Sequence, residues 1–308
     1  MSTFLKALQN ISLIRDVKEV TLDDETQARL LTAPNGKERV ASAMTRSKEV
    51  RVYRIVYTSH GHAVIGFVVE PRARAVPFPC IIYNRGGSGE FGKITTEQLF
   101  LHLARVASWG YVVIASQYSG NDGGEGKDEM GGADLEDVLV LQKILKKIPQ
   151  ADATRIGMYG GSRGGMMTYL CLARVKWLKA AVSVAGLADL FRQEELRPDM
   201  KKNFKNMFAV NRESLKRRSA VHWVNKFCKK TPVLLLHGSA DWRVSPLDSL
   251  DLSREMLCEK IPHRLVLFEG ADHNLSEFRP QRFELIRLWM ERFVKKGEAL
   301  PDLKLHGE

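Results

Sequence analysis

The chain has 308 residues, 44% of them hydrophobic and 27% charged, and a formal net charge of +11 at pH 7. This composition is that of a globular protein and excludes a disordered chain, and no apolar run approaches the roughly 18 residues that a membrane-spanning helix needs. The N-terminus lacks the apolar core and cleavage site of a signal peptide, and the four cysteines are widely spaced with no CxxC pair. Both features favour a cytoplasmic protein with reduced thiols.

The chain begins with a polar, weakly periodic stretch, residues 1–49, which is expected to form an N-terminal arm. Residues 50–71 then carry two β-branched and aromatic runs around a Ser-His-Gly-His turn, the pattern of a β-hairpin. After the hairpin, strand-like and helix-like patterns alternate. Strands are expected at 79–87, 111–117, 155–160, 179–186, 232–238 and 263–270, and helices at 95–110, 134–149, 163–175, 245–260 and 279–296.

This alternation predicts the fold class α/β, with a mainly parallel central sheet flanked by helices. We expect residues 50–308 to form one catalytic domain, because the pattern runs on to the last helix. The alternation is interrupted only at residues 188–227. This segment contains ten Lys or Arg residues and five Asp or Glu residues, which gives it a net charge of +5. This segment is interpreted as a small basic helical cap, either a solvated surface or a patch that steers anionic substrates. No nucleic-acid motif accompanies it, so no nucleic-acid partner is expected.

The segment Gly160-Gly161-Ser162-Arg163-Gly164 matches the G-x-S-x-G pattern and lies between a predicted strand and a predicted helix. In a nucleophile elbow a serine sits on a sharp, strained turn, so small residues are needed on either side of it. The N-terminal end of the following helix would face developing negative charge. Ser162 is therefore the candidate nucleophile.

A serine hydroxyl needs a histidine to take its proton and a carboxylate to orient that histidine. Asp241 follows the strand at 232–238, and His273 follows the strand at 263–270. The order Ser, acid, His is that of α/β-hydrolases, and each residue falls at the carboxyl end of a predicted strand. The sequence therefore predicts a Ser162–Asp241–His273 triad. His237 precedes the acid and is expected to make local contacts only.

The oxyanion site needs two donors. We expect the backbone N–H of Arg163 to be one, and the loop containing Gly86 and Gly87 to supply the other. The same loop holds a formal GxGxxG pattern, but the next predicted strand ends in Gln117 rather than the acid that a dinucleotide site uses. No cofactor is therefore expected, and since no histidine cluster has metal-ligand spacing, no catalytic metal either.

The G-x-S-x-G-G elbow, "TPVLLLHGSADWRV" and "GADHNL" resemble the catalytic domain of the prolyl oligopeptidase family of serine peptidases, over roughly residues 50–294. More distantly they are similar to dienelactone-hydrolase-like esterases. The resemblance implies Ser162 as nucleophile with Asp241 and His273. Two features depart from it: the roughly 50 residues before the hairpin cannot form the family's β-propeller, and Arg85 stands where an oxyanion tyrosine would fall. Arg85 could donate to the oxyanion, anchor a carboxylate or make a structural ion pair.

The sequence thus predicts a serine hydrolase that cleaves an ester or a peptide or amide bond through an acyl-enzyme on Ser162. Its substrate would be a small ester or a short peptide, and the sequence leaves peptidase and esterase activity, as well as the oligomeric state, open. The alternative is a non-catalytic binding protein of the hydrolase fold that uses the basic segment. No membrane partner is expected.

Overall fold

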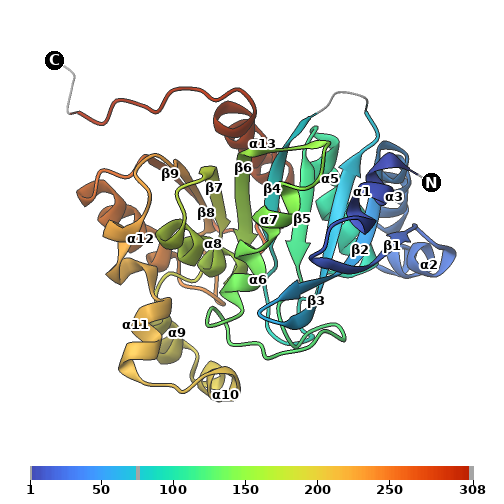
Figure 1. The fold of residues 1–308 in the computed structure, drawn as a ribbon. Helices are drawn as coiled ribbons and strands as arrows, with labels where there is room; N and C mark the ends of the chain where they lie inside the picture. The colour runs from blue at the N-terminus through green and yellow to red at the C-terminus, as the bar shows by residue number, and fades with distance from the viewer. Residues whose placement is uncertain (1, 74–76, 305–308) are drawn as a thin grey trace. The chain divides into compact units, whose positions relative to one another are not determined.

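A computed structural model describes residues 2–73 and 77–304 (Figure 1). Contacts divide the chain into two compact units. Unit 1 comprises Met1–Asp128 and Glu136–Thr154, and unit 2 comprises Glu129–Leu135 and Arg155–Glu308. No helix in the described ranges combines the length and the apolar character needed to cross a membrane.

Unit 1 contains five strands in the spatial order β1-β2-β3-β5-β4. Neighbouring strands are antiparallel except for β4 and β5, which are parallel. The strands are β1 (Ile14–Val20), β2 (Val50–Ser59), β3 (His62–Pro71), β4 (Phe78–Asn84) and β5 (Val112–Ser116). The helices are α1 (Thr3–Gln9), α2 (Asp24–Thr32), α3 (Gly36–Glu49), α4 (Thr96–Gln98), η1 (Leu99–Leu103), α5 (Ala104–Ser108) and α7 (Leu141–Leu145), with α6 (Leu135–Leu139) beginning at the boundary.

The predicted hairpin is formed by β2 and β3, whose register runs from Val50 opposite Pro71 to Ser59 opposite His62. Its two-residue turn, His60-Gly61, has positive φ at both positions (47° and 82°), as a type I′ turn requires. Gly61 therefore adopts a positive φ angle that would be strained for most other residues. The arm also contains β1, which the sequence pattern did not reveal.

Unit 2 is a run of parallel strands, β6-β7-β8-β9, each joined to the next through helical connections. Every residue of β8 is buried, and in β7 every residue except Lys179 is buried, in keeping with a sheet covered on both faces. The strands are β6 (Ala151–Gly161, its first four residues in unit 1), β7 (Leu178–Val184), β8 (Val233–Gly238) and β9 (His263–Phe268). The helices are α8 (Arg163–Arg174), α9 (Leu190–Leu196), α10 (Pro198–Met207), α11 (Arg212–Arg218), η2 (Ala220–His222), η3 (Val224–Lys226), α12 (Pro246–Cys258), α13 (Arg279–Met290) and η4 (Glu291–Lys295).

Local sequence signals explain where the helices of unit 2 begin. Ser245 caps α12 by accepting the backbone N–H of Leu247, and Pro246 takes the first helical position, where a missing N–H costs nothing. In α11, Asn211 and Ser214 form a reciprocal capping box. Together α9, α10 and α11 occupy the basic segment and lie at one end of unit 2 (Figure 1).

Candidate active site

Ser162 lies on the turn that joins β6 to α8. Its backbone has φ +56° and ψ −125°, a conformation that a residue with a side chain adopts only under strain. Hydrogen bonds hold the turn in place: the Ser162 N–H donates to Val184 O (2.9 Å), and its carbonyl accepts from the Gly165 N–H (2.9 Å). The predicted strand–turn–helix context of the elbow is therefore present.

Close packing of α8 against the end of β7 depends on a glycine beyond the pattern. A Cβ on Gly165 would lie 2.3 Å from Ser183 Oγ and 2.5 Å from the Cα of Gly186. At both distances the atoms would overlap. Gly165 therefore lets the helix approach β7, which keeps the turn at Ser162 tight. The G-x-S-x-G pattern instead predicts that Gly160 and Gly164 provide this room, and their roles stay predictions.

Arg163, the first residue of α8, has a buried side chain that pairs with a buried carboxylate. Its Nη2 lies 2.7 Å from Asp134 Oδ2, and the two side chains are 2% and 0% exposed. Asp134 also accepts the backbone N–H groups of Gly131 and Gly132. The pair ties the loop at 129–135 to the start of α8, where the helix N–H groups point out of the N-terminal end.

Removing one partner of this pair leaves the other as an uncompensated buried charge. We expect Asp134→Asn to lower the free energy of unfolding by about 3 kcal/mol, seen as a lower midpoint in urea. The matched control is Glu284→Gln, which removes a surface ion pair with Arg287. That variant should leave the midpoint almost unchanged, since exposed pairs contribute little. Equal midpoints for the two variants would contradict the assigned role of Asp134.

Asp241 follows β8, and its carboxylate is fully used. Oδ1 accepts the backbone N–H groups of Arg243 (2.8 Å) and Val244 (3.1 Å), while Oδ2 accepts from His273 Nδ1 (2.7 Å) and lies 3.1 Å from His237 Nε2. Burial disfavours the charged form, but the hydrogen bonds from the two histidines outweigh it and hold the pKa of Asp241 well below its usual value. The carboxylate is therefore ionised at neutral pH.

His273 follows β9, and its side chain is 9% exposed. With Nδ1 on Asp241, the opposite ring nitrogen, Nε2, is the one available to a reacting group. The neighbouring carboxylate of Asp272 turns the other way, because it accepts the backbone N–H groups of Asn274 and Ser276 and the Ser276 hydroxyl. Asp272 thus holds the loop that carries His273.

The structure therefore brings two of the three predicted triad residues, Asp241 and His273, into direct contact. Ser162 belongs to the same unit, and its side chain makes no hydrogen bond to His273 within the described part of the chain. Such bonds are often long before substrate binds and tighten in the complex.

Arg85, Gly86 and Gly87 lie in unit 1. The Arg85 guanidinium is buried and donates to the backbone carbonyls of Gln117, Gly86, Phe91 and Gly89. It therefore supports the glycine-rich loop from inside. Gly87 has φ +71°, and a Cβ there would lie 2.1 Å from a loop carbonyl oxygen, so only glycine fits. The oxyanion role of this loop stays a prediction.

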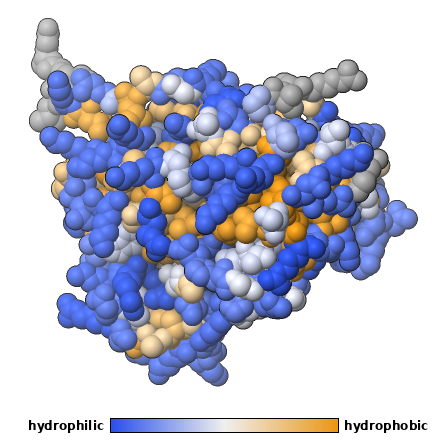
Figure 2. All heavy atoms as spheres, in the orientation of Figure 1, coloured by the Kyte–Doolittle hydropathy of each residue, from blue (hydrophilic) through white to orange (hydrophobic). Residues whose placement is uncertain are grey.

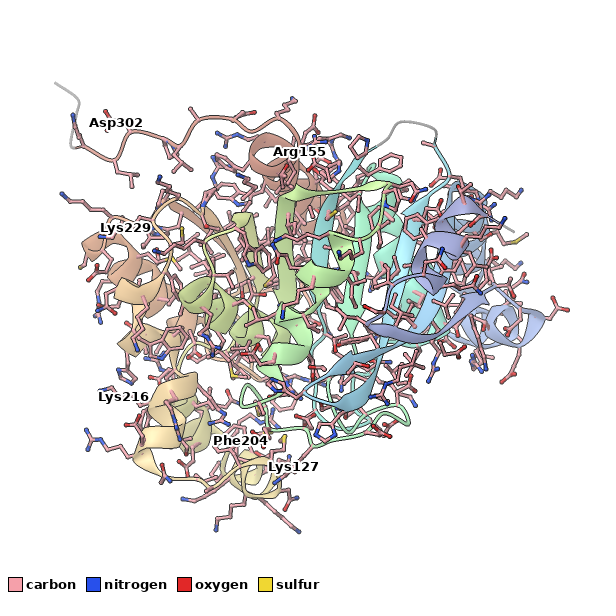
Figure 3. All side chains as sticks on the ribbon, viewed as in Figure 1. Lys127, Arg155, Phe204, Lys216, Lys229 and Asp302 are labelled. Atoms are coloured by element: carbon pink, nitrogen blue, oxygen red, sulfur yellow. The ribbon has the colours of Figure 1, made fainter. Side chains whose placement is uncertain are left out.

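The basic segment carries fewer free charges than its composition suggests. Hydrophilic residues predominate over α9–α11 in Figure 2, and Lys216 extends from α11 in Figure 3, but Arg218 is buried. Its guanidinium donates to the carbonyls of Glu129, Met130 and Ser214 and packs 3.9 Å from the ring centroid of Phe208. Further arginine and lysine side chains form ion pairs with acids: Arg192, Arg197 and Lys201. Neutralising Arg218 would therefore test stability and not substrate steering.

The contact of His237 with Asp241 was not predicted from the sequence. His237 was expected to make local contacts, and it does, but one of them is to the candidate acid itself. Its place four residues before Asp241, at the end of a buried strand, was the signal available. Among the described residues no group of three or more His, Cys, Asp or Glu side chains is arranged to hold a metal ion.

The parallel strands of unit 2, the flanking helices, the strained serine and the Asp–His contact define an α/β-hydrolase, and solved structures agree. An acylaminoacyl peptidase of Pyrococcus horikoshii superposes with a TM-score of 0.70 at 24% identity, covering 82% of this chain and 43% of that one. A dienelactone hydrolase described as putative, from Klebsiella pneumoniae, gives a TM-score of 0.60 at 18% identity, covering 79% of this chain and 99% of that one. The predicted fold class is confirmed.

Residues 97–297 match the model of the prolyl oligopeptidase family, and the chain belongs to that family. The uncharacterized peptidase YtmA of Bacillus subtilis is 34% identical over 204 residues, covering 65% of this chain and 77% of its own length. The next two curated relatives are longer, and the matches cover 45% and 29% of them. The predicted resemblance is thus confirmed, and the chain is an enzyme of the serine-hydrolase class.

Proposed function

We propose that this protein cleaves a peptide bond in short peptides through an acyl-enzyme on Ser162, with Asp241 and His273 completing a catalytic triad. The observation that carries the proposal is the 2.7 Å contact between His273 Nδ1 and Asp241 Oδ2, in the unit that also holds Ser162 on its strained turn. Asp241 would fix the tautomer of His273 that leaves Nε2 free to take a proton.

The reaction would proceed in two steps. Ser162 Oγ attacks the carbonyl carbon while His273 Nε2 takes the hydroxyl proton, and the protonated ring then gives that proton to the leaving amine or alcohol. In the second step water attacks the acyl carbon while His273 Nε2 takes its proton. The ring then returns that proton to Ser162 Oγ, so the acid product leaves and the serine hydroxyl is restored. The backbone N–H of Arg163, at the start of α8, would donate to the oxyanion. The second donor, which the sequence places in the loop of Gly86 and Gly87, stays a prediction.

Peptides are proposed over simple esters because of the relatives. YtmA is named a peptidase, and the Pyrococcus relative is an acylaminoacyl peptidase. A small-ester substrate is the second candidate, since the dienelactone hydrolase is covered almost completely by this chain. The cytoplasmic location expected from the sequence stays a prediction, as does the division into an arm (1–49) and a catalytic domain (50–308) with a basic cap (188–227).

A panel of substrates separates the two candidates. We expect N-acylated and free aminoacyl p-nitroanilides to be hydrolysed with kcat/KM of about 10⁴ M⁻¹s⁻¹ or more for the best compound, within the usual range of enzymes. The background is the Ser162→Ala variant. Hydrolysis confined to p-nitrophenyl esters, with no anilide cleaved above that background, would contradict the peptidase proposal and favour the esterase.

A further inference from the structure

His237 stands at the end of β8 with its ring completely buried. Both ring nitrogens have polar neighbours. Nδ1 lies 2.7 Å from Ser249 Oγ on α12, and Nε2 lies 3.1 Å from Asp241 Oδ2 and 3.1 Å from Val244 O. The proposed reaction does not use this ring, although it touches the carboxylate that the reaction depends on.

The partners define the tautomer of His237. A carboxylate oxygen and a backbone carbonyl oxygen are both acceptors, so Nε2 must carry the proton that it shares between Asp241 and Val244. Ser249 can donate its hydroxyl proton, so Nδ1 accepts it. The ring is therefore clamped between α12 and the loop that follows β8.

This donor completes the surroundings of Asp241. Oδ1 takes two backbone N–H groups, and Oδ2 takes one N–H from each histidine, so that all four lone-pair directions of the carboxylate are occupied. A carboxylate held in this way cannot rotate about its Cβ–Cγ bond without losing hydrogen bonds. Its orientation toward His273 Nδ1 is thus set partly by His237.

We propose that His237 is a positioning residue, which holds Asp241 Oδ2 toward His273 and takes up part of the charge that the carboxylate presents to that ring. The proposal rests on the proposed function, since it assigns His237 a part in the same triad. It predicts that removing the Nε2 donor both misorients Asp241 and strengthens its electrostatic hold on a protonated His273.

The other charged groups near this chain of contacts have separate partners. Asp272, beside His273, is bound by its own loop. Asp248 precedes Ser249 on α12 but accepts from the Ala188 and Asp189 N–H groups and pairs with Arg192. Asp241 is accordingly the carboxylate that couples the two histidines.

Two substitutions separate the roles of the ring nitrogens. In His237→Gln the side-chain amide nitrogen falls near the position of Nε2 and can still donate to Asp241. In His237→Asn the shorter side chain places its amide near Nδ1, facing Ser249, and leaves Asp241 without the donor. Both variants exchange an aromatic ring for an amide, so they share most of the packing loss.

The measurement is the second-order rate of labelling of Ser162 by a fluorophosphonate between pH 5 and 9, which needs no knowledge of the substrate. Its acid limb reports loss of the proton from His273. We expect His237→Asn to move this limb upward by about half a pH unit, since one donor to Asp241 is lost. The plateau rate should fall about tenfold, a typical effect for a group that orients a reacting residue. His237→Gln should keep the limb in its wild-type place.

A limb that stays in place in His237→Asn, or that moves equally in both variants, would overturn the proposal. If neither variant folds, the wild-type protein decides: the imidazole ¹⁵N shifts at pH 7.5 should show His237 protonated at Nε2 and bare at Nδ1. A proton on Nδ1 would contradict the hydrogen bonds assigned to this ring, in which Nδ1 accepts from Ser249. Failure of the proposed function is a different result, namely wild-type protein that is not labelled at Ser162 at any pH.

Discussion

The Ser162→Ala variant is expected to hydrolyse the best substrate of the wild-type protein about 10⁶-fold more slowly in kcat. The loss is this large because the acyl-enzyme cannot form without the hydroxyl oxygen of Ser162. The remaining groups of the site can then accelerate only a direct attack of water on the substrate. Alanine has the same backbone preferences as serine at φ +56°, so the midpoint of urea unfolding should change little.

A matched serine variant controls for effects unrelated to the hydroxyl of Ser162. Ser253 lies on α12, is part-buried and shares a hydrogen bond with His263. Ser253→Ala should keep wild-type activity. A Ser162→Ala protein that keeps more than about a thousandth of the wild-type kcat would show that another group attacks the substrate.

The Asp241→Asn variant is expected to lower kcat by about 10⁴-fold, because an amide no longer selects the tautomer of His273 with a bare Nε2. Asp272→Asn is the control, since that carboxylate adjoins His273 in sequence but binds its own loop. Its activity should fall by tenfold or less. Equal losses in the two variants would contradict the assignment of Asp241.

The same substitution has a pH signature in stability. The pKa of Asp241 lies below its usual 3.8 in the folded protein, so its charged form stabilises the fold fully above that value. This contribution is lost as the pH falls below about 4 toward the folded-state pKa. The difference in unfolding free energy between wild type and Asp241→Asn should therefore be constant near neutrality and shrink in acid. A difference that grows in acid would contradict the hydrogen-bond account of Asp241.

The parts of the molecule that could be predicted from the sequence are those that depend on hydrophobic periodicity and on local turn and helix-capping residues. The β2–β3 hairpin follows from its β-branched runs and the His60-Gly61 turn, and α12 begins at the Ser245-Pro246 pair. The Asp241–His273 contact was also predictable, because each residue follows a parallel strand and β8 pairs with β9. Chain order thus carried information about a contact between residues 32 positions apart.

Other features depend on where side chains point, which composition does not reveal. β1 was missed because only Ile14 is buried in a strand that is otherwise exposed or half-buried, so no alternation of apolar residues marks it. Arg218 counted as part of a surface charge excess, yet it is buried against backbone carbonyls. The ion pair of Arg163 with Asp134 joins residues 29 positions apart and has no local signal.

Whether Ser162 is the nucleophile can be decided by locating a covalent adduct on the chain. Wild-type protein would be treated with a fluorophosphonate, digested and analysed by mass spectrometry. We expect one adduct per chain, on Ser162 in the peptide that contains the turn between β6 and α8, and none in Ser162→Ala. Folded wild-type protein that carries no adduct, or carries it on another residue, would show that Ser162 is not the nucleophile.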